Sequence, residues 1–228
     1  MERESQYGTP FASYCTSARL LVLEDSHDIE MLIVITASPS GLDIERPALV
    51  LQDDVLVRLL AEVRYGSREA QQRLYEYFHR RVYRLLVRMV GRDDAEDLLQ
   101  QVFLQVFRTL NQFRGQSRFE TWLYRVSVNE SLQHLRKQRS RRSVSLESDI
   151  MDRKLDPVLD FDQKELMEYA LTRLEPELRS LFLLREVEKQ SYAEIAVVLK
   201  IPEGTVASRL GRARQLLKQY LVELGWEP

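Results

Sequence analysis

The 228-residue sequence has one cysteine, three histidines and eight glycines, and its formal net charge is only −2. The single cysteine, Cys15, excludes an internal disulfide framework and favours a reducing compartment, so we expect a cytoplasmic protein. The histidines lie far apart without cysteine neighbours, so no metal site is expected. No apolar run reaches transmembrane length, and Met31 to Ala37 is too short and poorly flanked for a secretory signal, which excludes a membrane partner.

The sequence also lacks the residue patterns of common active sites. It contains no Ser/His/Asp set, no phosphate-binding loop and no carboxylate pair in a plausible pocket. We therefore expect a protein that is not an enzyme, with no catalytic residues and no cofactor.

The small net charge results from a segregated distribution. From Arg108 to Arg142 nine Lys or Arg residues stand against two acidic residues, and from Lys200 to Lys218 five stand against one. Between these segments, Glu147 to Glu168 carries eight acidic and three basic residues. Two basic segments separated by an acidic one predict two nucleic-acid contact sites joined by a connector.

The stretch Ser191 to Leu221 has the pattern of a helix-turn-helix. Ser191 and Glu194 form a capping box that predicts a helix start, and Pro202 predicts a break before a second helix. The buried face of the second helix is expected to consist of Val206, Leu210, Ala213 and Leu217. Its opposite face carries hydroxyls and guanidinium groups suited to bases and phosphates: Thr205, Ser208, Arg209 and Arg212. The alternative is a solvated helical hairpin with ordinary surface arginines.

Residues 1 to 48 do not share the pattern of the rest, and we expect a poorly ordered extension there. Arg19 to Asp28 has some likeness to the first strand and acidic turn of a receiver domain, but the further βα units that a receiver needs are missing. From Asp53 onward, apolar residues recur at helical spacing. The pattern predicts helices over Asp53–Tyr65, Ser67–Val90 and Asp93–Leu110. Their apolar faces can bury a common core, which indicates an all-α fold that begins with an antiparallel bundle.

Local signals mark the ends of these helices. Gly66 and Gly91 are expected to end the first two. Asp93 with Glu96 has the spacing of a capping box, so it is expected to open the third.

The third of these helices carries an apolar residue on its polar side. Leu104 lies opposite the expected inward stripe, and it is surrounded by Asp97, Gln100, Gln101 and Arg108. An exposed apolar residue ringed by polar ones is typical of a protein-docking site. The alternative is that neighbouring helices of the same domain cover this side.

A loop with Gly115 as its bend leads into a helix from about Phe119. Its inward stripe is expected to be Tyr124, Val128, Leu132 and Leu135. A separate, exposed stripe is expected to be Trp122, Arg125, Asn129, Gln133 and Arg136. A tryptophan in line with arginines and amides can stack on unpaired bases and hold phosphates. The alternative is that Trp122 belongs to the core, because tryptophan is highly buried on average.

Charge runs, weak periodicity and Pro157 between Arg139 and Asp162 predict a flexible linker. Helices then resume over Gln163–Leu174 and, after Pro176, over Glu177–Glu186. We therefore expect four segments: an extension over 1–48, a helical domain over 49–140, a linker over 141–162 and a helix-turn-helix domain over 163–225.

Three stretches of this chain occur in the order in which one protein family carries its motifs. They are DAEDLLQQVFLQVFR (Asp94–Arg108), FRGQSRFETWLYRVSVN (Phe113–Asn129) and LEPELRSLFLLREVEKQSYAEIAVVLKIPEGTVASRLGRAR (Leu174–Arg214). Together they resemble an extracytoplasmic-function (ECF) sigma factor of bacterial RNA polymerase. The resemblance extends over about Asp53–Leu221. It implies two small helical domains, and it implies core RNA polymerase and promoter DNA as partners, with an anti-sigma factor where one exists.

The resemblance also implies a role for each surface. By this resemblance, the residues that dock on the clamp helices of the largest polymerase subunit would be Asp97, Gln100, Gln101 and Leu104. Reading and opening of the −10 promoter element would fall to Phe113, Arg114, Trp122, Arg125, Asn129, Arg136 and Lys137. Reading of the −35 element in the major groove would fall to Thr205, Ser208, Arg209 and Arg212, with Arg214 and Lys218 on phosphates.

Three positions depart from the family pattern. Ala207 stands where many members have Lys or Arg, and Gln101 replaces a frequent Glu. Trp122 is followed by Leu123 where primary sigma factors have a tryptophan pair, so strand opening should depend on a strong promoter match.

Each domain alone neutralises few phosphates, so we expect little promoter affinity for the free chain and firm binding once polymerase holds both domains. The main alternative is a free-standing helix-turn-helix regulator that dimerises through its N-terminal bundle and binds palindromic half-sites. A helical adaptor that binds only protein is a second alternative.

Overall fold

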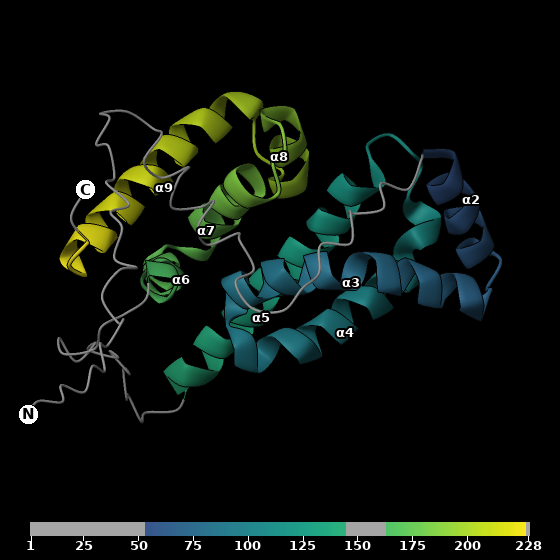
Figure 1. The fold of residues 1–228 in the computed structure, drawn as a ribbon, viewed down its shortest axis with the longest axis horizontal. Helices are drawn as coiled ribbons and strands as arrows, with labels where there is room; N and C mark the ends of the chain where they lie inside the picture. Colours follow the sequence, from purple (N-terminus) through teal and green to yellow (C-terminus); the bar gives the residue numbers. More distant parts are fainter. Residues whose placement is uncertain (1–52, 145–162, 227–228) are drawn as a thin grey trace, which may run out of the picture.

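The computed structural model describes residues 53–144 and 163–226, and all regular structure in these two ranges is helical (Figure 1). The predicted all-α fold with two helical domains is confirmed. The predicted extension over 1–48 and most of the predicted linker lie outside the described residues.

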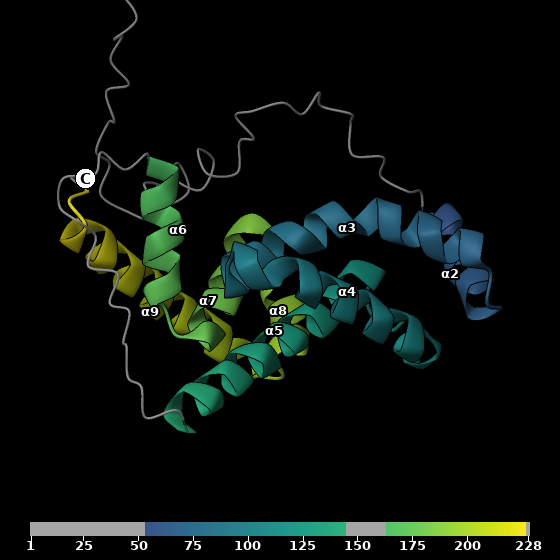
Figure 2. The same ribbon diagram turned by 90° about the horizontal axis from the view of Figure 1, so that it is seen from below.

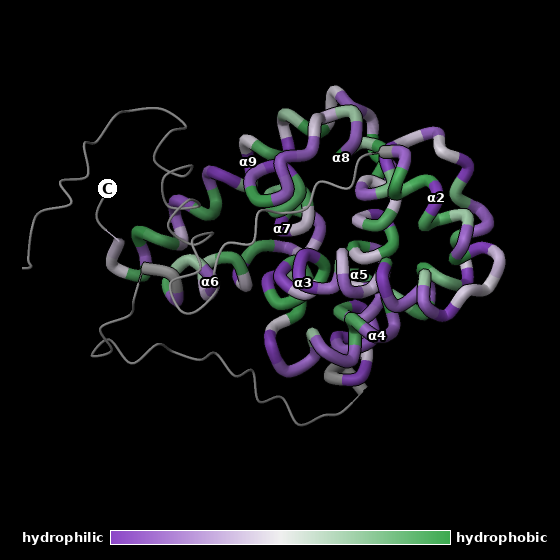
Figure 3. Tube along the Cα trace, turned by 45° about the vertical axis from the view of Figure 1, so that its right-hand side comes forward, coloured by the Kyte–Doolittle hydropathy of each residue, from purple (hydrophilic) through white to green (hydrophobic). Residues whose placement is uncertain are grey.

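The N-terminal domain consists of four helices around one core. They are α2 (Asp53–Arg64), α3 (Arg68–Val90), α4 (Arg92–Thr109) and α5 (Phe119–Val144), with a short 3-10 turn over Leu110–Gln112. The apolar faces of α2, α3 and α4 point inward as their spacing predicts, and Leu74, Val82 and Val102 are completely buried. Figure 3 shows the resulting alternation of hydrophobic and hydrophilic residues around the helices.

Two helix boundaries differ from the sequence prediction. The predicted capping box of Asp93 with Glu96 does not form, because Gly91, with a φ of +94°, completes the turn after α3 in one residue and α4 already starts at Arg92. Helix α5 continues to Val144, four residues beyond the predicted domain end at residue 140. The basic run there consists mainly of Arg, Lys and Gln, which are good helix formers.

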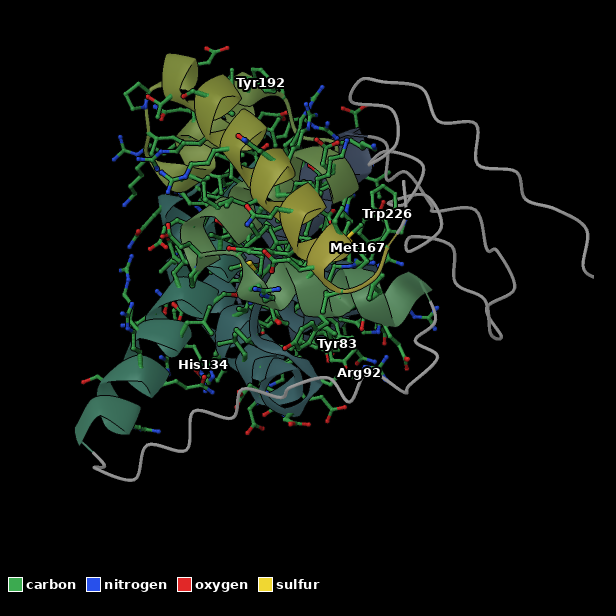
Figure 4. The ribbon with its side chains drawn as sticks, turned by 90° about the vertical axis from the view of Figure 1, so that its left-hand side faces the viewer. Tyr83, Arg92, His134, Met167, Tyr192 and Trp226 are labelled. Carbon is green, nitrogen blue, oxygen red and sulfur yellow. The ribbon has the colours of Figure 1, made fainter. Side chains whose placement is uncertain are left out.

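The C-terminal domain consists of α6 (Gln163–Arg173), α7 (Pro176–Phe182), a π-helical turn η2 (Leu183–Val187), α8 (Tyr192–Leu199) and α9 (Glu203–Glu223). The predicted first-turn position of Pro176 is confirmed. The buried stripe of α9 is also as predicted, with Val206, Leu210, Ala213 and Leu217 all inside. Met167 of α6 and Trp226 belong to the same core, and Figure 4 shows them on one side of the domain.

The helix-turn-helix boundaries follow from local chemistry. The Ser191 side chain accepts a hydrogen bond from the Glu194 N–H at 3.2 Å, and the Glu194 carboxylate accepts one from the Ser191 N–H at 2.8 Å, so the predicted capping box is confirmed. Lys200 adopts a left-handed conformation with φ +55°, and Pro202 is the N-cap of α9. These two residues turn the chain sharply between α8 and α9.

The two domains pack against each other along α5, which lies beside α7 and α8 (Figures 1 and 2). Tyr124 and Val128 of α5 join Leu85 and Met89 of α3 in the apolar core of the C-terminal domain. Tyr124 and Val128 of the predicted inward stripe of α5 are therefore buried, but they face the other domain rather than their own. Leu132 and Leu135, the other two residues of that stripe, are half-buried. Periodicity identifies an apolar face without identifying the element that covers it.

Candidate promoter-binding and polymerase-binding surfaces

Helix α9 presents the predicted polar face to solvent. Ser208, Arg209, Arg212 and Lys218 are exposed, and Thr205 is half-buried. The Ser208 hydroxyl donates to the Thr205 carbonyl at 3.1 Å, so that hydroxyl lies near the helix backbone. Arg209 and Arg212 are three residues apart on one exposed face, which is the arrangement a recognition helix needs in a major groove.

Arg214 has a different environment from the other basic residues of α9. Its Nε and Nη2 atoms lie 3.0 and 2.5 Å from Oε1 of Glu186, whose side chain is 2% exposed. Removing one partner of such a buried pair costs about 3–5 kcal/mol, because the remaining charge stays buried and unpaired. Arg214 therefore holds η2 against α9. Its predicted contact with DNA phosphates stays a prediction.

The loop before α5 and the first turns of α5 form a pocket of about 430 Å³. It is lined by Gln112, Phe113, Arg114, Gln116, Ser117, Trp122, Arg125 and Val197. Gly115, with φ +72°, lies at the bend of this loop. Four residues predicted for the −10 element therefore come together here: Phe113, Arg114, Trp122 and Arg125.

The sequence predicted that Trp122 lies on an exposed stripe of α5, but its side chain is buried. It is 5% exposed, and its ring lies 5.6 Å from that of Phe113 and 5.7 Å from that of Phe119. The alternative that Trp122 belongs to the core is correct, because three aromatic rings enclose one another at the edge of the domain. Trp122 nevertheless lines the pocket with the little surface that it exposes.

The other residues predicted for the −10 element lie farther along α5. Asn129 and Lys137 are exposed and do not line the pocket. Arg136 Nη2 lies 3.4 Å from Glu177 Oε1 of α7, and both side chains are more than half exposed. Such an exposed pair contributes about 0–1 kcal/mol, so Arg136 can leave it readily.

Four residues of the pocket were not predicted from the sequence. Gln112, Gln116 and Ser117 adjoin Phe113, Arg114 and Gly115 in the sequence, so their position in the loop was the available signal. Val197 lies on α8 of the other domain, and nothing in the sequence connects it to this loop.

Helix α4 presents the predicted apolar residue to solvent. Leu104 is 54% exposed, and Asp97, Gln100 and Gln101 around it are exposed as well. The alternative that the domain's own helices cover this side is wrong. A docking role for these four residues stays a prediction.

Each of the two domains matches a known protein family. The family described as Sigma-70 region 2 matches residues 74–141, and the family described as Sigma-70, region 4 matches residues 164–217. An ECF RNA polymerase sigma-E factor of Haemophilus influenzae is 30% identical over 179 residues, which cover 73% of this chain and 95% of the relative. The protein of the same name from Escherichia coli K12 is 33% identical over 181 residues, which cover 73% and 93%. This chain belongs to the ECF sigma factor family.

Two solved structures share the fold of this ECF sigma factor. CnrH, in complex with the cytosolic domain of CnrY, is 22% identical with a TM-score of 0.55, over 73% of this chain and 96% of that one. The sigma factor RpoE of Bartonella quintana, in complex with the anti-sigma factor NepR, is 23% identical with a TM-score of 0.54, over 66% and 95%. We name α2–α5 the region 2 domain and α6–α9 the region 4 domain.

A buried carboxylate joins the two domains of this sigma factor. Glu188, which follows η2, accepts a hydrogen bond from the Tyr124 hydroxyl of α5 and lies 2.9 Å from Nε of Arg81 on α3. Its side chain is 4% exposed. Burial raises the pKa of Tyr124 far above its ordinary value, and the charge of Glu188 raises it further. Tyr124 therefore stays neutral and acts as the donor.

Three more hydrogen bonds cross the boundary between the domains. The Thr121 hydroxyl on α5 lies 3.1 Å from Oε1 of Gln190 and 3.0 Å from Oε1 of Glu194. Arg179 of α7 donates through Nη1 to the Met89 carbonyl near the end of α3 at 2.6 Å. Burial lowers the pKa of Arg179 to about 10, so the side chain remains charged at neutral pH.

Within residues 53–144 and 163–226, no helix has the length and apolar character needed to cross a membrane. The same ranges hold no cluster of three or more His, Cys, Asp or Glu that could bind a metal ion.

Proposed function

We propose that this ECF sigma factor binds core RNA polymerase and directs it to promoters through their −10 and −35 elements. The observation that carries the proposal is that region 2 and region 4 matches fall on two separate helical domains, each with an accessible face of the chemistry its task requires. A free-standing helix-turn-helix regulator is not favoured, because a region 2 domain accompanies the helix-turn-helix. Such a factor acts in the cytoplasm, and we expect this chain to have no active site.

For the −35 element, the proposed reader is the exposed face of α9. Arg209 and Arg212 can each form two hydrogen bonds to a guanine edge, and Ser208 and Thr205 can reach bases or phosphates. Lys218 is suited to a phosphate near the end of the contact. Ala207 lies on the same exposed side and supplies no polar contact.

For the −10 element, the proposed reader is the pocket before α5. Its volume of about 430 Å³ is within the range of small-ligand pockets and suits one unstacked base. Arg114 and Arg125 at its border can hold the adjoining phosphates, while Gln112 and Gln116 can recognise polar base edges. The exposed Asn129, Arg136 and Lys137 extend this surface along α5.

For polymerase, the proposed contact is the exposed face of α4 around Leu104. An apolar residue within a polar rim is the usual anatomy of an interface centre. The clamp helices of the largest subunit are the proposed partner. An anti-sigma factor is a further predicted partner of this chain.

The proposal is tested by transcription with purified core polymerase and a library of random promoter sequences. We expect run-off transcripts from a subset of sequences that share −10 and −35 elements, and little DNA binding by the free chain. A polymerase core that does not retain the wild-type chain in a pull-down would contradict the proposal.

Leu104→Arg should reduce retention on core polymerase at least tenfold, because it places a charge at the centre of the interface. Val57→Arg is the matched control, since Val57 of α2 is 64% exposed and lies outside the proposed contact. Equal loss in both variants, or none in Leu104→Arg, would remove α4 from the proposed interface.

A further inference from the structure

The second half of α3 is rich in arginine and lacks acidic residues. Residues 77–90 contain four arginines and no Asp or Glu. Three of them, Arg80, Arg84 and Arg88, are spaced four residues apart, so they lie along one face of the helix. We call these three the α3 arginine row. Arg80 and Arg84 are exposed and Arg88 is half-buried, so the row forms a positively charged strip about 12 Å long on the region 2 domain.

The charges of this helix are matched unequally by the rest of the protein. Arg81, the fourth arginine, lies 2.9 Å from the buried Glu188, so its charge has a partner. Burial lowers the pKa of Arg88, and the carboxylates of Glu168 and Glu188 counteract this shift. The nearby positive charge of Arg84 lowers that pKa further. In the described parts of the chain, Arg84 itself has no carboxylate within ion-pair distance.

The row therefore has a reason to bind an anion. Arg84 stands four residues from both Arg80 and Arg88, and like charges at this spacing destabilise a helix. An anionic partner at Arg84 would remove a repulsion as well as add an attraction. Helix α3 lies along one side of the region 2 domain, so such a partner can approach it from solvent (Figure 2).

The chain that precedes α2 carries the complementary charge. Residues 1–52, which lie outside the described residues, contain eight acidic residues, three arginines and no lysine. Four of these acidic residues fall within seven positions that hold no Lys or Arg: Glu24, Asp25, Asp28 and Glu30. We call residues 24–30 the acidic segment. A guanidinium can hold a carboxylate through two parallel hydrogen bonds, so these groups suit the α3 arginine row.

The length of chain between the two surfaces allows them to meet. Residues 31–52 separate Glu30 from Asp53, where α2 begins. A flexible chain of this length has an r.m.s. end-to-end distance of roughly 25 Å and reaches about 75 Å when extended. Helix α2 is about 18 Å long, and Arg84 lies about 26 Å along α3 from Ser67. The distance to bridge is of the same order as the r.m.s. length, which gives an intramolecular partner a high effective concentration.

We propose that the acidic segment docks on the α3 arginine row and is an intramolecular partner of the region 2 domain. The inference goes beyond the proposed function, because none of the three arginines belongs to the surfaces proposed for polymerase or for the −10 and −35 elements. An anion from another molecule would have to compete with carboxylates that are joined to the same chain.

The first test measures the distance between the acidic segment and α3 in the full chain. Ser26→Cys and Gln72→Cys, combined with Cys15→Ser, place one spin label in the segment and one at an exposed position of α3. Pulsed electron paramagnetic resonance should show a narrow distance population for the docked segment. This population should fall at least twofold between about 0.1 M and 1 M NaCl, because the Debye length decreases from about 10 Å to about 3 Å.

The second test reverses the charge of the row. Arg80→Glu with Arg84→Glu should reduce the narrow population at least threefold. Arg58→Glu with Arg108→Glu is the matched control, because both residues are exposed and the change of charge is the same. Arg58 is also nearer to the acidic segment in the sequence, so mere proximity would make the control the more sensitive variant. The control should keep the narrow population, and circular dichroism verifies that both variants remain helical.

The third test restores the attraction with the charges exchanged. A segment with all four carboxylates replaced should lose the narrow population: Glu24→Arg, Asp25→Arg, Asp28→Arg and Glu30→Arg. Combined with Arg80→Glu and Arg84→Glu, the same four changes should recover a narrow population at least twofold above that of either reversal alone. A purely structural role of the two arginines in α3 would give no such recovery.

Three results would overturn the docking of the acidic segment: a broad distance distribution at low salt, equal responses of the row and of its control, or no recovery on charge exchange. If the distribution is broad and Arg80→Glu with Arg84→Glu weakens DNA binding by the polymerase complex, the row is a nucleic-acid contact and the proposal is wrong. The transcription experiment is a separate readout, since a chain that transcribes without a docked segment contradicts only this inference.

Discussion

The two proposed DNA-reading surfaces of this sigma factor differ in how they are built. The −35 surface lies on one helix, α9, whose polar face is exposed and whose apolar face is buried within the same domain. The −10 surface is a pocket made from a loop, from α5 and from Val197 of the other domain. A surface on a single helix follows from local spacing, whereas a pocket between elements depends on how distant segments pack.

The two surfaces also contain both exposed residues, which are proposed to contact DNA, and buried residues with structural partners. On α9, Arg209 and Arg212 are exposed, while Arg214, two residues after Arg212, is bound to the buried Glu186. On α5, Arg125 reaches the pocket, while Trp122 is largely enclosed by aromatic rings. Residue type alone does not distinguish the two roles.

The largest expected effect is on the structural arginine of α9. Arg214→Met should destabilise the region 4 domain by about 3–5 kcal/mol, because Glu186 remains buried without its partner. Thermal or urea unfolding measures this change. The double variant Glu186→Leu with Arg214→Met should regain most of the stability and keep promoter binding. If the stable double variant lost promoter affinity, Arg214 would be a DNA contact after all.

The next effect is on the exposed arginines of α9. Arg209→Ala with Arg212→Ala should weaken promoter binding by the polymerase complex by about 2–4 kcal/mol, since a good bidentate contact is worth about 1–3 kcal/mol. The unfolding free energy should change little. Arg209→Lys with Arg212→Lys is the control that keeps the charge but loses the forked geometry, so it should relax sequence preference more than affinity. Unchanged preference in the Lys pair would argue against base reading by these residues.

A smaller effect is expected at the enclosed tryptophan. Trp122→Leu should cost about 2–3 kcal/mol of unfolding free energy, less than a full truncation to Ala, because the Phe113 and Phe119 rings lose part of their packing. It should also weaken binding of a single-stranded oligonucleotide with the −10 element, because the pocket loses part of its wall. Trp226→Leu in the region 4 core gives a similar loss of stability as a control. Equal strand binding in both variants would show that Trp122 acts only through the core.

The smallest effect concerns the carboxylate that caps α8. Burial alone would raise the pKa of Glu194, but hydrogen bonds from the Ser191 N–H and hydroxyl and from Thr121 outweigh it and hold the pKa below its ordinary value of 4.5. The stabilisation is therefore complete above pH 4.5 and is lost as the pH falls through the lowered pKa. Unfolding measured from pH 7 to pH 3 should show this loss. Glu194→Gln should remove this part of the pH dependence, and an identical profile in the variant would contradict the assignment.

Local spacing in the sequence was sufficient to predict the helices, the capping box of Ser191 and the two faces of α9. It was also sufficient for Leu104, because an isolated helix pattern shows which residue stands on the polar side. These features depend on contacts between residues three or four positions apart, which hold whatever surrounds the helix.

Tertiary structure alone decided what covers each apolar face. Tyr124 meets Glu188 at a separation of 64 residues, Arg214 meets Glu186 across 28, and Val197 reaches a loop that begins 85 residues earlier. Such pairings depend on the packing of whole domains, and helical periodicity carries no information about them. For this reason α5 has an apolar side that faces the region 4 domain, and Trp122 lies inside where its spacing predicted an exposed position.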